Sequence, residues 1–239
     1  MTTVVDLTSG LPITREFLLA ERPSDPEFRE GCSVWISDDR GAIGLPRVSV
    51  EAVANSWDRR EVQVNIAFPS GRVIQVREPC EGVTPIDSDG VARVFKAGGL
   101  EFRCDAPFAE WTVTFVGRGL DTTALAQAAD DVTGAAEIDV SFRVHTTMAV
   151  PAWIQGALVE SAGEALSKGV EGLFMGGDRY EQLFRAEGEA RIGNESFTFA
   201  GTGLRIHRQG VRNVTGFWGH CWQSALFPDG RGFGYIALP

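Results

Sequence analysis

The sequence predicts an all-β protein, built as an antiparallel barrel or sandwich. Apolar and polar residues alternate with a period of two in segments such as 62–68, as they do in a half-buried strand. Turn residues separate these segments at short intervals. The 239 residues are 44% hydrophobic and 23% charged, which is typical of a globular chain and not of a disordered or fibrous one.

The predicted strands follow one another with tight turns between them. Segments 62–68 and 73–76 flank a turn in which Gly71 is free to adopt a positive φ. Further turns are expected at 88–90, 97–99 and 228–231. The other expected strands are 91–95, 100–104, 111–116, 138–144, 180–185, 197–199, 204–207, 217–223, 225–227 and 233–236.

The strand pattern is interrupted twice. Residues 121–136, rich in Ala and Asp, are expected to form a loop or a short helix. Residues 151–177 place Val159, Ala162, Leu166 and Val170 at roughly helical spacing. Each glycine in that stretch weakens a helix by about 1 kcal/mol relative to alanine, so we expect a short helix at most.

These breaks divide the chain into four parts. We expect an N-terminal segment (1–29), a first antiparallel β-barrel unit (30–147), a connector (148–177) and a second, short β unit (178–239). The second unit has room for about five strands, whereas a barrel that encloses a ligand usually has about eight. It would close against the first unit or against another subunit, or the natural chain continues beyond Pro239, because an unpaired apolar edge promotes aggregation.

Charge and motifs exclude several classes of function. A net charge of −10 argues against a nucleic-acid partner and disfavours docking on anionic lipid. Without a signal peptide or an apolar run long enough to span a membrane, a cytoplasmic protein with no membrane insertion is expected. The four cysteines lack zinc-ligand spacing and are expected to be free thiols. Hydrolase, zinc-protease and dinucleotide motifs are absent, which leaves an enzyme without a motif open.

The densest cluster of residues suited to ligand binding or catalysis lies at 203–223. Alternation places two sets of side chains each on a common face: Arg205, His207 and Gln209 in one strand, and Trp218, His220 and Trp222 in another. If 204–208 pairs with 217–223, these side chains line one surface. The loop between the two strands carries Arg212, and loops at barrel mouths often carry function.

That surface suits a bulky apolar ligand with few polar atoms. Indole rings supply stacking area, histidine can transfer a proton near pH 7, and arginine can orient a carboxylate or carbonyl. The alternative interpretation is structural, with tryptophan and histidine in the core and arginine in an ion pair. Glu181 is either a general acid with a pKa raised by burial, or the ion-pair partner of an arginine such as Arg205.

Several segments resemble a known family: Tyr180-Glu-Gln182, Gly201-Thr-Gly-Leu-Arg-Ile-His207, Gly210-Val-Arg212 and Trp218-Gly-His-Cys-Trp222. They are similar to the carotenoid 1,2-hydratase and AttH-like group of bacterial proteins of unassigned function. The resemblance implies tandem lipocalin-like (calycin-type) barrels, an enclosed apolar ligand, no metal and no nucleotide cofactor. Because Tyr180 and Gln182 lie in one of these segments, we also expect them to bind the substrate. Relatives often carry an acidic residue beside the histidine where this chain has Ile206, so an Asp-based protonation is in doubt.

Three functions follow as hypotheses. The first is a cofactor-independent lyase or isomerase that hydrates, cyclises or isomerises an isoprenoid, polyketide or steroid-like ligand. Its catalytic candidates are His207, His220 and Glu181, and its substrate-binding candidates are Arg205, Arg212, Trp218, Trp222, Gln182 and Tyr180. The second is a non-catalytic carrier of a lipophilic small molecule. The third is an interaction module, for example a homodimer formed through the open edge of the second unit.

Overall fold

The fold is described by a computed structural model for residues 5–155, 178–211, 219 and 221–237. Its strands are β1 (Phe28–Asp38), β2 (Gly44–Val53), β3 (Arg59–Ala67), β4 (Arg72–Glu81), β5 (Val94–Ala97), β6 (Leu100–Ala106), β7 (Glu110–Thr123), β8 (Ala136–Met148), β9 (Trp153–Ile154), β10 (Asp178–Ile192), β11 (Glu195–Val211), β12 (Cys221–Leu226) and β13 (Gly232–Ala237). The helices are η1 (Ile13–Glu16), η2 (Ala54–Ser56) and α1 (Ala124–Ala128). None of the described helices could cross a lipid bilayer, because each is too short. The predicted all-β class is confirmed.

Antiparallel pairing joins most strands into one sheet, part of which closes on itself. The strand order is β4-β3-β2-β1-β11-β10-β8-β7-β6-β5, and β9 pairs with β10. A further pairing of residues 72–75 in β4 with 120–123 in β7 closes the strands from β4 round to β7 into a ring. β12 and β13 form a separate two-stranded sheet. The predicted antiparallel barrel is therefore confirmed, and the second, small sheet is the β12–β13 hairpin.

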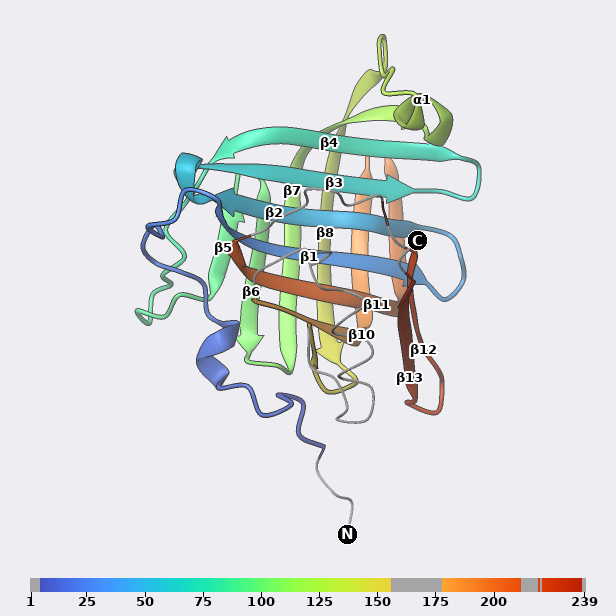
Figure 1. Cartoon of the computed structure of the whole chain (residues 1–239). Coiled ribbons are helices and arrows are strands. Elements are labelled where there is room, and N and C mark those ends of the chain that lie inside the picture. Colours follow the sequence, from blue (N-terminus) through green and yellow to red (C-terminus); the bar gives the residue numbers. More distant parts are fainter. Residues whose placement is uncertain (1–4, 156–177, 212–218, 220, 238–239) are drawn as a thin grey trace.

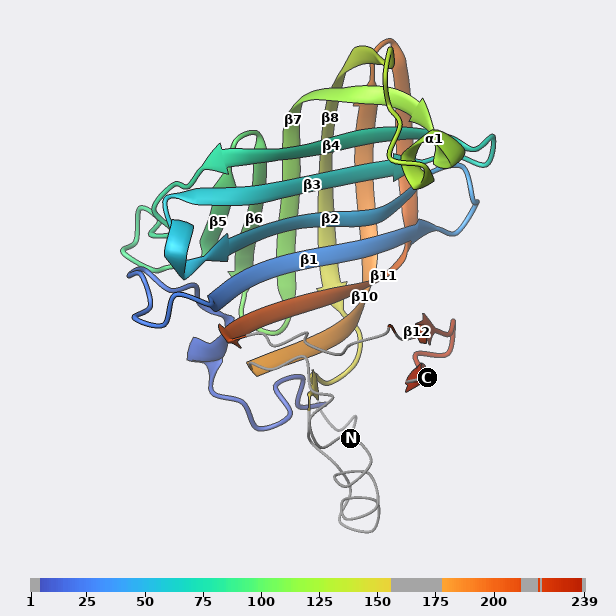
Figure 2. The ribbon, with the colours of Figure 1, turned by 45° about the horizontal axis from the view of Figure 1, so that its top comes forward.

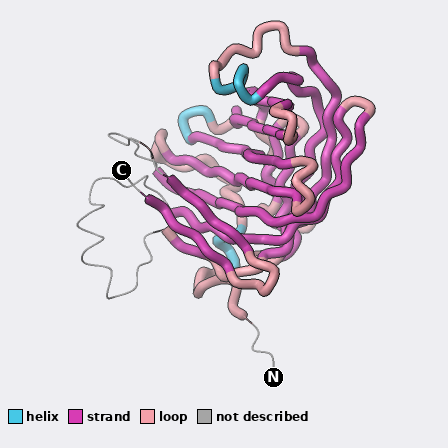
Figure 3. Tube along the Cα trace, turned by 90° about the vertical axis from the view of Figure 1, so that its right-hand side faces the viewer, coloured by secondary structure: helices cyan, strands magenta, loops and turns pink. Residues whose placement is uncertain are grey.

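The ring consists of two layers whose strands cross. Figure 1 shows β1 to β4 running across the front and β5 to β8 running behind them. The long strands β10 and β11 pass from one layer to the other, and the sheet curls round on itself (Figures 2 and 3). A Cβ at Gly201 would lie 1.9 Å from the carbonyl oxygen of Ser37, and one at Gly203 would lie 2.3 Å from that of Trp35. Glycine is required there because the backbones of β11 and β1 approach so closely.

Inward-facing side chains of the ring form the hydrophobic core. The predicted alternation holds in β3, where Val62, Val64 and Ile66 are buried. The rings of Phe115 and Phe142 stack in the same cluster with their centroids 5.8 Å apart. Buried apolar residues from β1 to β8, β10 and β11 form one continuous cluster. This cluster fills the ring with side chains, as in other barrels of about eight strands.

The strands of the expected second unit join the sheet of the first. β10 pairs with β8, and residues 201–211 of β11 pair with the whole length of β1. This arrangement corresponds to the alternative in which the short unit closes against the first. The physical reason is that β1 and β8 would otherwise expose unpaired edges, which β10 and β11 cover.

Some local expectations differ from the structure. The two strands predicted at 197–199 and 204–207 are parts of the single strand β11. Residues 121–136 hold the end of β7, the five-residue helix α1 and a loop before β8. Most of the segment where a short helix was expected, 156–177, lies outside the described residues.

Candidate functional site

The candidate residues of β10 and β11 point to two opposite sides of the barrel wall. Tyr180 and Gln182 face the interior, together with Arg205 and His207 of β11. Arg179, Glu181 and Leu183 alternate with them and face outward, as do Leu204, Ile206 and Arg208. The predicted cluster therefore separates into an interior polar network and an outer groove.

The interior network brings four predicted residues together. The Tyr180 hydroxyl lies 2.7 Å from Nδ1 of His207, and Arg205 donates a hydrogen bond of 2.7 Å to the side-chain oxygen of Gln182. All four side chains are buried. The predicted common face of Arg205, His207 and Gln209 is confirmed. Arg205 also lies over the rings of Trp111 and Tyr180, at 4.8 and 5.3 Å from their centroids.

Glu16, which the sequence analysis did not single out, is the centre of this network. Its carboxylate accepts hydrogen bonds from Arg205 (2.6 Å), Trp111 (2.7 Å) and the backbone N–H of Phe108 (3.1 Å), and from the hydroxyl of Tyr180. Burial alone would raise the pKa of Glu16. The positive charge of Arg205 and the hydrogen bonds from Tyr180 and Arg205 outweigh burial, so the pKa of Glu16 is lowered.

A second buried carboxylate, Glu30, extends the network toward the N-terminal segment. Gln209 donates a hydrogen bond of 2.7 Å to Glu30, which also accepts one of 3.0 Å from the backbone N–H of Leu19. Nε2 of His207 lies 3.8 Å from the same carboxylate. The N-terminal residues 15–19 are thus held at the interior of the ring. Their hydrogen bonds run to Arg205, Gln209 and Glu30. The network is shielded from water, but among the described residues Nε and Nη1 of Arg205 and Nε2 of His207 have no hydrogen-bond partner.

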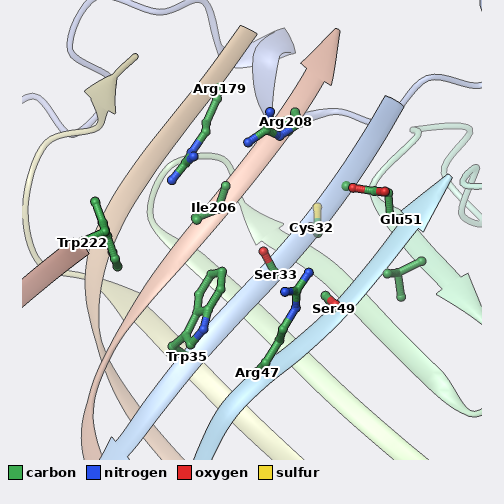
Figure 4. Close-up of a pocket in the computed structure, with 12 residues that line it drawn as sticks. Cys32, Ser33, Trp35, Arg47, Ser49, Glu51, Arg179, Ile206, Arg208 and Trp222 are labelled. Atoms are coloured by element: carbon green, nitrogen blue, oxygen red, sulfur yellow. The ribbon is translucent and has the colours of Figure 1, made fainter. Parts of the chain in front are cut away.

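The outer groove lies on the opposite face of the same strands. It is a pocket of about 180 Å³ lined by residues of β1, β2, β10, β11 and β12 (Figure 4). Trp35 and Trp222 form an aromatic wall, with ring centroids 6.5 Å apart and an interplanar angle of 49°. Arg179 and Arg208 lie near one another toward the far end of the groove (Figure 4). Such a combination of aromatic and charged side chains can hold an amphipathic small molecule.

Glu181 faces outward and pairs with Arg179, so the expected ion pair with an arginine is confirmed, but its partner is not Arg205. Glu181 and Arg205 cannot meet, because they point to opposite sides of the sheet. Burial raises the pKa of Glu181 and outweighs the neighbouring charges of Arg179 and Arg208. The ion pair is almost completely buried.

The expected pairing of 204–208 with 217–223 is also wrong. β1 and β10 occupy the two edges of β11, and β12 pairs with β13 instead. Trp222 therefore reaches the outer groove and does not join His207. Arg212, Trp218 and His220 lie outside the described residues.

The structure also identifies residues that sequence reasoning missed. Glu30 shares the inward face of β1 with Cys32, Val34 and Ile36, so its position in that alternation was a usable signal. Glu16 lies in a short 3-10 turn, where no periodicity marks an inward side chain. Among the described residues, no group of three or more His, Cys, Asp and Glu side chains could hold a metal ion.

Comparison with solved structures shows a likeness of fold. A provisionally named AttH protein from Nitrosomonas europaea is 13% identical, with a TM-score of 0.52 over 93% of this chain. The chain spans 66% of that protein's length. At this identity the likeness supports the AttH-like resemblance at the level of fold alone. No curated protein matches the sequence.

The family is shown by a match over most of the chain. The model of a family described as "Domain of unknown function (DUF7064)" matches residues 20–238. This range begins after η1 and includes every strand of the ring and the β12–β13 hairpin. The chain therefore belongs to the DUF7064 family.

Proposed function

We propose that this protein binds a lipophilic small molecule in the outer groove and carries it without transforming it. The observation that supports this most directly is the aromatic wall formed by Trp35 and Trp222 over a space of about 180 Å³. Trp35, Trp222 and Leu226 pack against buried Leu183, Leu204 and Ile206, so an apolar surface continues from the groove under β12. Aromatic side chains of this kind provide most of the binding energy in small-molecule sites.

Binding in the groove is favoured over binding within the barrel. The ring interior is occupied by a continuous cluster of apolar side chains. At the end of the ring, Glu16 and Arg205 are tied to each other and are almost completely buried. Glu181, another acid–base candidate, is held in an ion pair by Arg179. These groups stabilise the fold where they are, whereas the tryptophans of the groove are partly exposed.

The test is a binding measurement with N-phenyl-1-naphthylamine, a neutral apolar fluorophore. We expect saturable binding to the wild-type protein and a loss of about tenfold in affinity for Trp222→Ala, the usual size of an aromatic contact's contribution. Trp153→Ala is the matched control, because Trp153 is 43% exposed on β9 and does not line the groove. Equal affinities for all three proteins would overturn the proposal.

A specific contact supports a second candidate, the cofactor-independent lyase or isomerase. The hydroxyl of Tyr180 contacts His207, and Tyr180 also lines a second pocket of about 120 Å³ with Leu11, Arg15 and Ile154. Burial holds the pKa of Tyr180 well above its ordinary value, so the phenol is a proton donor at neutral pH. In this scheme Tyr180 donates its proton to a double bond of an isoprenoid, polyketide or steroid-like substrate. His207 takes a proton from the resulting cation, or from the water that adds to it, and passes it to the Tyr180 oxygen across their 2.7 Å contact.

The two candidates are separated by the fate of the bound molecule. Native mass spectrometry of freshly purified protein identifies any retained ligand and the oligomeric state together. The enzyme predicts that this ligand is converted over time by the wild type and not by Tyr180→Phe. The carrier predicts that its mass and structure stay unchanged with both proteins.

A further inference from the structure

We infer that the ligand of the outer groove is an organic acid, whose carboxylate is bound by Arg47, Arg179 and Arg208 while its ring system packs on Trp35 and Trp222. The inference rests on the proposed function of the groove and names the chemical class of its ligand.

The first argument comes from the strand register. Arg179 of β10 and Arg208 of β11 are directly opposite one another, and they are only 6% and 8% exposed. Like charges in this position destabilise strand pairing. Glu181 pairs with Arg179 and also lies near Arg208. The buried Nε of Arg179 has no hydrogen-bond partner among the described residues. A ligand carboxylate at this end of the groove adds charge-assisted hydrogen bonds to the guanidinium groups that line it.

The second argument is the charge of the lining. Arg47 of β2 adds a third guanidinium group, which lies near Ser33 and Ser49 in Figure 4. Glu51 is the single acidic residue among the described lining residues, and Arg29 engages it at 2.8 Å. This concentration of arginine occurs in a chain whose net charge is −10. Locally positive potential on an acidic protein attracts and orients an anionic ligand.

The third argument is that the lining combines guanidinium groups with an apolar wall. Figure 4 shows Arg179 and Arg208 at one end, Trp35 near the other with Arg47 beside it, and Ile206 between them. Trp222 continues the apolar wall through its contact with Trp35. The volume of about 180 Å³ is below the usual size of a pocket for a drug-sized molecule, about 300–1,000 Å³. An acid with one or two rings fits this combination of charge, apolar surface and size.

The experiment compares two probes of the same shape, 2-naphthoate and 2-naphthalenemethanol, which differ in the acid group. Quenching of tryptophan fluorescence or calorimetry gives Kd for each. We expect wild-type protein to prefer the acid by about tenfold or more, since charge-assisted hydrogen bonds to arginine are strong. Arg47→Gln, at an exposed position, should remove most of this preference by lowering the affinity for the acid much more than the affinity for the alcohol.

Two further variants complete the test. Arg118→Gln changes the net charge equally but lies on β7, away from the groove, and should keep the preference. Gly31→Val fills the groove floor without removing a charge. A Cβ at Gly31 makes only ordinary contacts, the nearest at 3.5 Å. We expect this variant to bind neither probe, and its circular dichroism spectrum and thermal unfolding check that it is folded.

The possible failures are distinguishable. Equal affinity of the wild type for acid and alcohol, with no effect of Arg47→Gln, overturns the inferred acid and leaves the proposed groove standing. Binding of neither probe to the wild type up to about 1 mM, a free energy of about −4 kcal/mol, overturns the proposed function itself. Unchanged binding to Gly31→Val places the probes elsewhere and also overturns the inference.

Discussion

Nη2 of Arg205 lies 2.6 Å from Oε1 of Glu16, a contact that joins β11 to the 3-10 turn near the N-terminus. Both side chains are almost completely buried. The same carboxylate holds Trp111 and Tyr180, so one residue links the N-terminal segment, β7 and β10. Because the partners come from distant parts of the chain, the contact forms only when the N-terminal segment packs against β7, β10 and β11.

Replacing Glu16 should therefore be strongly destabilising. Glu16→Gln leaves the buried guanidinium of Arg205 without its counter-charge, and breaking a buried pair in this way costs about 3–5 kcal/mol. The free energy of unfolding, measured in urea with circular dichroism, should fall by this amount.

The matched control is an ion pair on the surface. Arg118 and Glu137 are 2.6 Å apart, but their side chains are 62% and 56% exposed. Glu137→Gln should change stability by about 0–1 kcal/mol. Similar losses for the two variants would show that the interior network is not what holds the N-terminal segment in place.

The contribution of Glu16 should also depend on pH. Its pKa in the folded protein is lowered from 4.5, and its carboxylate faces Arg205, Tyr180, Trp111, His207 and Cys104. A carboxyl with a lowered folded-state pKa stabilises the protein fully above the unfolded-state pKa. That stabilisation is lost as the pH falls through the folded-state value, because the proton then binds the folded state as well.

The measurement is the difference in unfolding free energy between wild type and Glu16→Gln at a series of pH values. It should be constant above about pH 5 and shrink below about pH 4.5, by at most about 1.4 kcal/mol per pH unit. A difference that grows on acidification would contradict the lowered pKa.

Alternation along the strands was enough to predict which side chains share a face. It placed Arg205 and His207 together correctly, because side-chain direction in a strand depends only on local backbone geometry. It could not predict which strands pair. β11 lies between β10 and β1, and the contact with β1 depends on closure of the ring between distant parts of the sequence. The expected pairing of 204–208 with 217–223 was wrong because both edges of β11 are occupied by these strands.

Only part of the candidate site could be predicted, because alternation does not show which strands are neighbours. Trp222 was recognised as a ligand-binding candidate, but its partner Trp35 comes from β1 and could be identified only from the folded structure. Glu181 was expected beside Arg205, although alternation in paired strands places the two on opposite faces once Glu181 is opposite Ile206. Knowledge of the register was the missing information.

The close approach of β11 to β1 gives a third prediction. Gly203→Ala places a Cβ 2.3 Å from the carbonyl oxygen of Trp35 and 2.5 Å from the ring of Phe184. Because the first contact is with backbone, the strand must move, and we expect a loss of about 1–3 kcal/mol or more. Thermal unfolding monitored by circular dichroism measures this loss.

The control for that prediction is a glycine at which an added Cβ makes only ordinary van der Waals contacts. At Gly31 the nearest atom to an added Cβ is the carbonyl oxygen of Val50, at 3.5 Å. Gly31→Ala should change stability by no more than about 0.5 kcal/mol. If Gly203→Ala is as stable as Gly31→Ala, the two strands lie further apart than described.

The four cysteines should react with a thiol reagent in a fixed order at neutral pH. Cys221 is exposed and should react first. Burial, with the nearby charge of Glu78, raises the pKa of Cys80 to about 11, so this half-buried thiol should react slowly.

The other two cysteines are buried. Burial, with the charge of Glu16, raises the pKa of Cys104 to about 12, and burial also holds the pKa of Cys32 well above its ordinary value. These two should react only after unfolding.

Time-resolved labelling with DTNB or iodoacetamide, followed by peptide mass spectrometry, tests this order. Cys104 lies beside Glu16, with its sulfur 3.9 Å from the carboxylate, so its protection reports on the closed end of the ring. Glu16→Gln should therefore expose Cys104 to labelling earlier than the wild type does. Cys221, on the separate β12–β13 sheet, should react at the same rate in both proteins. Rapid labelling of Cys104 in the native wild type would mean that Glu16 and the N-terminal segment do not shield this thiol.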